Sequence, residues 1–263
     1  MHFIQVSALV LQSDDIHVLA GSCSEEGKRG KGILDDYFQP ADVQLILKQA
    51  AEKCYRDAKD RGRQVRAAML AMVAGDFRLI VEMLSVLMSP DVDVPQNQDK
   101  VFWYGQAKGF YDAHLAKTTY VATTLEKGGQ RRAVDTLKAM MELHQFFCFI
   151  SARQFHDAWS ILDRLNIVPK SMAEIAEKGE RYRGLDPLLQ QRIPSVLLST
   201  MRTFHLEHNR LKAEMNTGSR TTVQSALAEL KERTSVVTSF AGVIGDVPQV
   251  QLEEMARLDA SMI

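Results

Sequence analysis

The sequence contains few cysteines, and they are poorly placed for either a disulfide framework or a metal site. Cys23, Cys54 and Cys148 are odd in number and far apart, and none lies at zinc-finger or CxxC distance from another. We therefore expect reduced intracellular thiols, no structural metal and no cofactor held by cysteine.

Turn-forming residues and unbalanced charge are also scarce. The 263 residues include only 15 glycines and 7 prolines. Together these make up about 8% of the chain, whereas an average protein has roughly 12%, and this shortage favours long helices. Basic residues number 32 and acidic residues 33, which gives a net charge of -1. That balance excludes a protein bound mainly to phosphate backbones, so we expect no direct nucleic-acid partner.

No apolar run approaches the ~20 residues that a transmembrane helix needs. The composition is otherwise that of a globular protein with a substantial core, since 46% of the residues are hydrophobic and 25% are charged. Disorder over the whole chain is therefore excluded.

Helical periodicity is the strongest positive signal. From Asp42 to Arg61, apolar residues recur at three- and four-residue steps while charged residues occupy the other face. Two further helices are predicted over 65–73 and 76–88. Gly75 and Asp76 stand between them as a helix terminator and a helix cap, which predicts an antiparallel hairpin.

The same hairpin pattern recurs 78 positions later. Ala74-Gly75-Asp76-Phe77 aligns with Ala152-Arg153-Gln154-Phe155, and the apolar positions that follow align as well, up to Pro90 and Pro169. An offset of 78 is about two units of 39, which is typical of helix-pair repeats. The alternative is that any two helical hairpins share a small residue and leucine spacing. The matching proline exits favour the repeat.

The rest of the chain is also helical, with no convincing strand. Ser171 and Glu174 predict a capping box at the start of one of its helices. Helices are expected over 98–127 (one long helix or a broken pair), 131–151, 171–183, 194–215, 221–244 and 249–260. The predicted fold class is all-α, an α-solenoid of stacked antiparallel hairpins, with flexible loops near 22–32, 89–98 and 216–222.

Signatures of catalysis are missing. The glycine-rich stretch from Gly27 to Gly32 does not match the phosphate-binding loop pattern, and a solvated loop is the better interpretation. His205 and His208 lie three apart on a predicted helix, but no further ligands stand in register for a metal. We expect no catalytic residue, no metal, no cofactor and no enzymatic activity.

One segment concentrates aromatic side chains. Phe102, Trp103, Tyr104, Phe110 and Tyr111 fall within ten positions, and aromatic residues are enriched at binding hot spots. They are our candidate partner-binding residues. The alternative is that these rings pack between neighbouring helices.

Three blocks in the second half carry a family resemblance. They are Phe155–Pro169 (FHDAWSILDRLNIVP), Leu197–Met201 (LLSTM) and Phe240–Ile244 (FAGVI). In order and spacing they resemble the C-terminal region of the nucleoporin-interacting-component family, the ninety-three-kilodalton class of nucleoporin. The first half agrees more loosely, and the chain departs from the family at 245–248.

The resemblance implies a non-enzymatic scaffold of the inner ring of the nuclear pore complex, located at the nuclear envelope and supporting nucleocytoplasmic transport. It also implies a large multi-copy assembly whose partners are other inner-ring nucleoporins, including linear segments of linker nucleoporins. Residues 1–263 would then form a single solenoid segment, the C-terminal part of a larger scaffold.

Two other functions stay open at the level of sequence. A cytosolic helical-repeat adaptor, or a coat-like component that binds partner peptides, would show the same repeat. An all-α enzyme would rest only on His205, His208 and scattered carboxylates.

Overall fold

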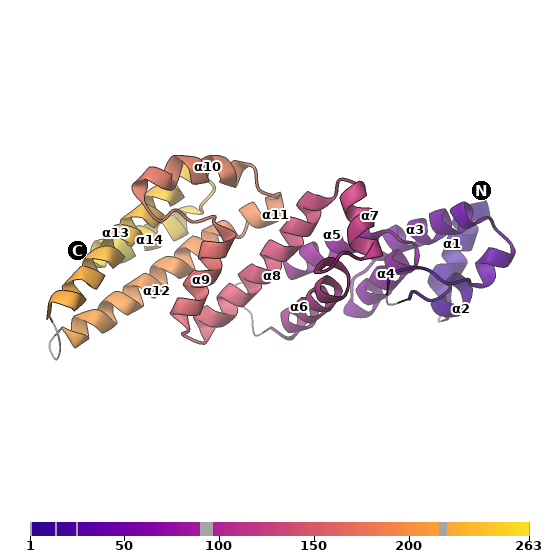
Figure 1. Cartoon of the computed structure of the whole chain (residues 1–263), viewed down its shortest axis with the longest axis horizontal. Helices are drawn as coiled ribbons and strands as arrows, with labels where there is room; N and C mark the ends of the chain where they lie inside the picture. The colour runs from indigo at the N-terminus through magenta and orange to yellow at the C-terminus, as the bar shows by residue number, and fades with distance from the viewer. Residues whose placement is uncertain (1, 14, 25, 90–96, 216–219, 263) are drawn as a thin grey trace. The chain divides into compact units, whose positions relative to one another are not determined.

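The computed structural model describes residues 2–13, 15–24, 26–89, 97–215 and 220–262, and these residues form an all-α protein (Figure 1). Their only β-type contact is an isolated bridge between Cys23 and Arg29. None of the described helices is long and apolar enough to cross a membrane. The predicted fold class is confirmed, because consecutive helices pair through short turns along the chain.

The chain divides into two compact units. Unit 1 comprises Met1–Leu87 and Phe102–Lys138, and unit 2 comprises Met88–Val101 and Ala139–Ile263. The first helices in chain order are α1 (His2–Gln12), α2 (Ile16–Ala20), η1 (Ile33–Asp36), α3 (Pro40–Arg56), α4 (Arg61–Val73), α5 (Phe77–Met88), α6 (Gln98–Phe110), a π-helical turn η2 (Tyr111–Leu115) and α7 (Tyr120–Lys127). They are followed by α8 (Arg131–Ser151), α9 (Phe155–Leu165), η3 (Met172–Glu174), α10 (Ile175–Arg183), α11 (Pro187–Gln190), α12 (Ile193–Glu214), α13 (Arg220–Ile244) and α14 (Gln249–Ser261).

The helix pair α3 and α4 forms the centre of unit 1. Most of the apolar stripe predicted on α3 is buried, including Val43, Ile46 and Leu47, which have no exposed surface, whereas Leu45 is 44% exposed. The predicted end of this helix at Arg61 is wrong, because α3 stops at Arg56. The carboxylate of Asp60 accepts a hydrogen bond from the Arg63 backbone N–H at 2.9 Å, so it caps α4 instead of continuing α3.

The turns of the predicted repeat have the same geometry. The backbone N–H of Asp76 donates to the Ala71 carbonyl and that of Gln154 to the Phe149 carbonyl, both at 2.9 Å. The residues just before these donors, Gly75 and Arg153, both have positive φ, at 67° and 58°. Each turn is therefore a left-handed helix terminator of the Schellman type. Both members of the aligned hairpin are confirmed as helix–turn–helix elements.

A third turn of this kind joins α7 to α8. Here the Gln130 N–H donates to the Leu125 carbonyl at 2.9 Å, and Gly129 has a φ of 69°. The segment 98–127 was expected to form either one long helix or a broken pair, and it forms a broken pair. It passes through the π-helical turn η2, and α7 begins after Thr119, whose hydroxyl accepts from the Ala122 N–H at 3.2 Å.

The predicted capping box at Ser171 is wrong. Ser171 makes no side-chain cap, and the first turn is the 3-10 helix η3, so α10 begins only at Ile175. The carboxylate of Glu174 instead accepts a hydrogen bond from the Lys170 N–H at 3.1 Å. The helices expected from Pro194, Thr221 and Gln249 are present, and each begins within one residue of the predicted start.

Unit 2 is built around α12 and α13, which lie side by side (Figure 1). α14 packs on both of them, and α10 packs on α13. Phe240 and Met201 fill this core without any exposed surface. The break between α13 and α14 is anchored to α10, because the Tyr182 hydroxyl donates to the Asp246 carboxylate at 3.0 Å. Burial and this hydrogen bond raise the pKa of Tyr182 to about 12.

Two of the three predicted loops lie largely outside the described residues, at 90–96 and 216–219. The third, near 22–32, makes specific contacts. Its Arg29 guanidinium donates to the Ala20 carbonyl at 2.7 Å and to the Asp35 carboxylate at 2.9 Å. Burial acts to raise the pKa of Asp35, but the hydrogen bonds from Arg29 and from the Gly32 N–H outweigh it and lower the pKa.

Candidate interaction surfaces

The aromatic segment of unit 1 lies on α6 and the π-helical turn that follows. Trp103 is only 4% exposed and belongs to the core of the chain. Four other rings are half-buried and keep part of their surface in solvent: Phe102, Tyr104, Phe110 and Tyr111. The five candidate residues therefore divide into one core residue and four residues that a partner could touch.

Contacts within unit 1 hold these rings in place. Phe102 meets Trp103 edge to face, with ring centroids 4.9 Å apart. The guanidinium of Arg61, the first residue of α4, lies 4.8 Å from the centre of the Phe102 ring, which is a cation–π distance. Phe110 lies 5.2 Å from the buried ring of His114. Phe102 and Phe110 thus have partners within the unit, and such contacts limit the side-chain entropy lost on binding.

A second surface lies in unit 2, where α9 meets α12. Trp159 stacks on Phe155 at a centroid distance of 6.5 Å and contacts Phe204 at 5.5 Å. The Trp159 indole N–H faces the Thr203 hydroxyl at 3.4 Å. These aromatic rings form a row that runs from the helix interface to the surface, because Phe204 is buried whereas Phe155 and Trp159 are half-buried.

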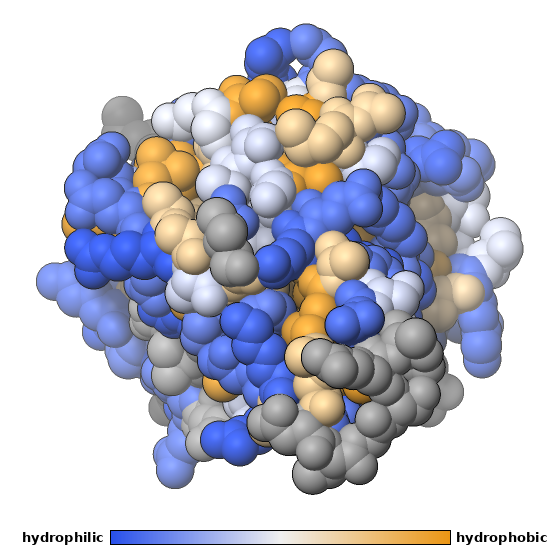
Figure 2. Space-filling view, turned by 90° about the vertical axis from the view of Figure 1, so that its left-hand side faces the viewer, coloured by the Kyte–Doolittle hydropathy of each residue, from blue (hydrophilic) through white to orange (hydrophobic). Residues whose placement is uncertain are grey.

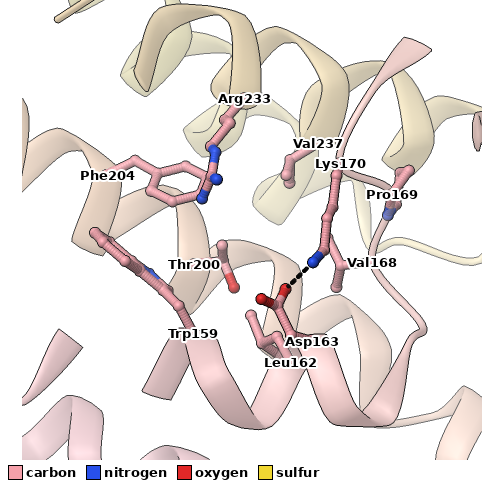
Figure 3. Close-up of a pocket in the computed structure, with 10 residues that line it drawn as sticks. All are labelled: Trp159, Leu162, Asp163, Val168, Pro169, Lys170, Thr200, Phe204, Arg233 and Val237. Carbon is pink, nitrogen blue, oxygen red and sulfur yellow. Dashed lines mark ion pairs between the residues drawn. The ribbon is translucent and has the colours of Figure 1, made fainter. Parts of the chain in front are cut away.

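Clefts open on both sides of Trp159. The smaller, of about 40 Å³, is bounded by Phe204 of α12 and Arg233 of α13 on one side and by the 168–170 connection on the other (Figure 3). At its mouth, Lys170 and Asp163 form an exposed ion pair at 2.8 Å. The larger is an open groove of about 810 Å³ whose wall includes Phe155 and Leu206, and Leu206 is 52% exposed.

We refer to these two openings together with the row Phe155–Trp159–Phe204 as the Trp159 cleft. Its lining combines apolar side chains with charged ones, and two pairs of the charged groups are ion pairs, Arg210 with Glu207 and Lys170 with Asp163. Such a surface can bury apolar side chains of a binding protein. The exposed charged groups at its rim can form new ion pairs with that protein at little cost in free energy.

Part of this cleft, Phe155–Pro169, is recognisable in the sequence only as a family block and not as a surface. The reason is that Trp159 and Phe204 are 45 positions apart, and their meeting depends on how α9 packs on α12. The available signal was the pair Phe155 and Trp159, four apart on one helix face.

The two histidines of α12 have different surroundings. His205 lies 2.9 Å from the Asn209 amide and 3.0 Å from the Ser261 hydroxyl, whereas His208 is fully buried. Within the described ranges, no three His, Cys, Asp or Glu side chains converge to hold a metal ion.

The end of unit 2 where α12 and α13 meet presents a mixed surface. Figure 2 shows hydrophilic side chains over much of this face, with apolar side chains in several separate areas between them. This is a surface suited to polar contacts with scattered apolar anchors.

Comparison with known proteins gives a family and a fold. A family model described as Nup93/Nic96 matches residues 1–248. The nuclear pore complex protein Nup93 of Danio rerio is 24% identical over 245 residues, which cover 91% of this chain and 28% of the relative. Nup93 of Xenopus tropicalis is 23% identical over 248 residues, again 28% of its length. The chain therefore spans little more than a quarter of the length of these relatives.

A solved structure shares the fold. The crystal structure of Chaetomium thermophilum Nic96 SOL superposes with a TM-score of 0.81, covering 97% of this chain and 40% of that chain, at 15% sequence identity. This likeness supports the helix-pair architecture along nearly the whole chain.

Proposed function

The chain belongs to the Nup93/Nic96 family, and on that premise we propose that it is a structural scaffold nucleoporin of the inner ring of the nuclear pore complex. The observation that carries this proposal is the family match over residues 1–248, and a common fold at a TM-score of 0.81 supports it. The proposal assigns the chain no catalytic step. Its place would be the nuclear envelope, where it would support nucleocytoplasmic transport.

The test of this proposal is the location of the endogenously tagged protein in living cells. We expect a punctate nuclear rim that coincides with a pore marker. A diffuse cytosolic signal, or one on vesicles, would favour the helical-repeat adaptor or coat-like component instead. The family match supports the scaffold over that alternative.

We propose further that the chain is one segment of a larger solenoid in a multi-copy assembly and that its partners are other inner-ring nucleoporins. Linear segments of linker nucleoporins are the partners that best suit the Trp159 cleft. A short peptide can insert one or two apolar side chains beside Phe155 and Leu206, where exposed apolar surface is otherwise in contact with water. The half-exposed rings Tyr104 and Tyr111 of unit 1 form a second proposed contact.

Leu206→Asp tests the Trp159 cleft. Leu206 is 52% exposed, so the substitution should change the melting temperature little while placing a charge where the partner needs an apolar surface. We expect at least about a tenfold loss of affinity for the co-purifying linear segment, since about 1.4 kcal/mol corresponds to a factor of ten.

The matched control is Val250→Asp, which places the same charge at a valine that is 75% exposed on α14 of the same unit. Binding isotherms of the two variants and the unchanged protein give the comparison. Equal affinities for all three would remove the cleft from the proposal and leave the scaffold role to other surfaces.

A further inference from the structure

The turn of the second aligned hairpin carries an arginine where its counterpart in the first hairpin carries a glycine. Gly75 aligns with Arg153, 78 positions later, and both residues adopt the left-handed conformation, with φ of 67° and 58°. Asn166 is the other non-glycine residue with a positive φ in the described ranges, and asparagine tolerates this conformation better than arginine does. Arginine therefore stands at a backbone position that suits glycine.

The helix that follows this turn also departs from its counterpart. Phe77 and Val81 of α5 are buried, at 2% and 0% exposed. The aligned residues of α9, Phe155 and Trp159, are half-buried and line the larger opening of the Trp159 cleft. The second hairpin thus presents two aromatic rings at positions where the first hairpin buries apolar side chains, and aromatic rings and arginine are the side chains most enriched at binding hot spots.

Arg153 lines the same opening as these two rings. It is exposed, and within the described residues its guanidinium forms no hydrogen bond and no ion pair. The other arginine of this opening, Arg210, differs, because its guanidinium donates to the Glu214 carboxylate at 2.7 Å and also pairs with Glu207. Arg153 is therefore the guanidinium of this opening that is available to a ligand.

One further charge in the opening limits how acidic that ligand can be. Asp157 lies in the first turn of α9, where its carboxylate faces the positive end of the helix dipole. It would repel a ligand that carries several negative charges, whereas a single carboxylate can pair with Arg153 at the turn.

We propose that Arg153 determines the specificity of the Trp159 cleft, which binds a linear segment that carries one acidic residue close in sequence to its apolar anchor. The anchor lies beside Phe155 and Leu206, and the carboxylate accepts two hydrogen bonds from the Arg153 guanidinium. This inference rests on the proposed binding of linear segments by the cleft and adds the charge that such a segment needs.

The backbone conformation of the turn agrees with this role. Residues held in strained backbone conformations are found preferentially at functional sites such as ligand clamps, where the surrounding structure compensates the strain. The turn also fixes the direction in which the Cβ atom of Arg153 leaves the main chain, because the Gln154 N–H is bonded to the Phe149 carbonyl at 2.9 Å. The base of the side chain is thus held in place while its guanidinium stays free.

The test is the selection of binding peptides from a random phage-displayed library, with the full chain as the target. We expect the selected sequences to combine a large apolar residue with one aspartate or glutamate at a recurrent spacing. Selection against Arg153→Gln should keep the apolar residue and lose the acidic one. Higher salt should weaken the acidic preference for the unchanged chain, because exposed charges are screened.

Binding isotherms of one selected peptide then measure the contribution of the charge. Replacement of its acidic residue by the corresponding amide should weaken binding to the unchanged chain about three- to tenfold and should change binding to Arg153→Gln little. This double-mutant cycle isolates the pair. Arg257→Gln, at an exposed arginine of α14 in the same unit, is the matched control and should bind the peptide as the unchanged chain does.

Arg153→Gly separates this role from a role in the fold. Glycine suits the left-handed turn, so this variant should be at least as stable as the unchanged chain and should still lose the acidic preference. A stable Arg153→Gly that keeps the full preference would overturn the proposal.

The failure of this inference differs from the failure of the cleft. Selected peptides that lose affinity in Leu206→Asp but carry no recurrent acidic residue, or that bind Arg153→Gln and the unchanged chain equally, would refute the role of Arg153 and leave the cleft in place. Peptides whose binding does not respond to Leu206→Asp would refute the cleft itself and the role of Arg153 with it.

Discussion

Trp103 shows how a single side chain can be assigned to a partner surface or to the core. It is 4% exposed and meets Phe102 at 4.9 Å. Its aromatic neighbours on α6 are half-buried. The alternative weighed from sequence, packing between helices, therefore describes Trp103, whereas partner binding by the other four rings stays a prediction.

Trp103→Ala should accordingly destabilise the chain. Truncation of a buried aromatic side chain costs about 3–5 kcal/mol because it removes contacts and leaves a cavity. We expect the midpoint of thermal unfolding of the isolated chain to fall by several degrees. Gln106→Ala, at an exposed position of the same helix, is the control. An unchanged midpoint for Trp103→Ala would show that the ring does not contribute to the core.

At the scale of elements, one of the turns that join helix pairs holds a residue in an unfavourable backbone conformation. Gly75 and Gly129 adopt positive φ without strain, but Arg153 adopts a φ of 58° in the equivalent place. A residue with a Cβ in this region is disfavoured by roughly 1–2 kcal/mol. Arg153 is exposed, and nothing in the structure explains why arginine stands there.

Arg153→Gly should therefore stabilise the turn between α8 and α9. Part of the relieved strain is offset by the greater freedom of glycine in the unfolded chain, so the net gain should be about 0.5–1 kcal/mol. Gly75→Ala in the aligned turn should have the opposite sign. Denaturant unfolding of both variants measures the two values, and a loss of stability in Arg153→Gly would show that its side chain makes an unrecognised contribution.

The same turns show what could be predicted from sequence. Periodicity identified the long helices, because the burial of one face is repeated over many residues, as in α3 and α13. Helix ends were less predictable because one side chain decides them. Asp60 caps α4 and so shortens α3, and Glu174 bonds to Lys170 instead of completing a capping box with Ser171.

Surfaces were predicted least well. The Trp159 cleft depends on the approach of Phe204, a residue 45 positions away on another helix, and His208 is fully buried whereas His205, three positions before it, is half-buried. Neither follows from local spacing. From sequence, His205 and His208 were considered as a metal-binding pair and set aside for want of further ligands; the structure shows His208 as a buried ring whose pKa is lowered, chiefly by burial.

At the scale of the whole molecule, the family match and the fold support one another. Identity to the Nup93 relatives is only 24%, yet the family model spans residues 1–248 and the Nic96 SOL fold covers 97% of the chain. Helix-pair repeats tolerate such divergence because each pair needs only an apolar face of suitable shape against its neighbours.

The scaffold role is tested most directly by affinity capture of the endogenously tagged protein at moderate salt, with quantitative mass spectrometry of the proteins that accompany it. We predict co-recovery of inner-ring and channel nucleoporins in fixed proportion to the tagged chain. A reproducible set of soluble adaptor or vesicle-coat proteins, with no nucleoporin among them, would contradict the account.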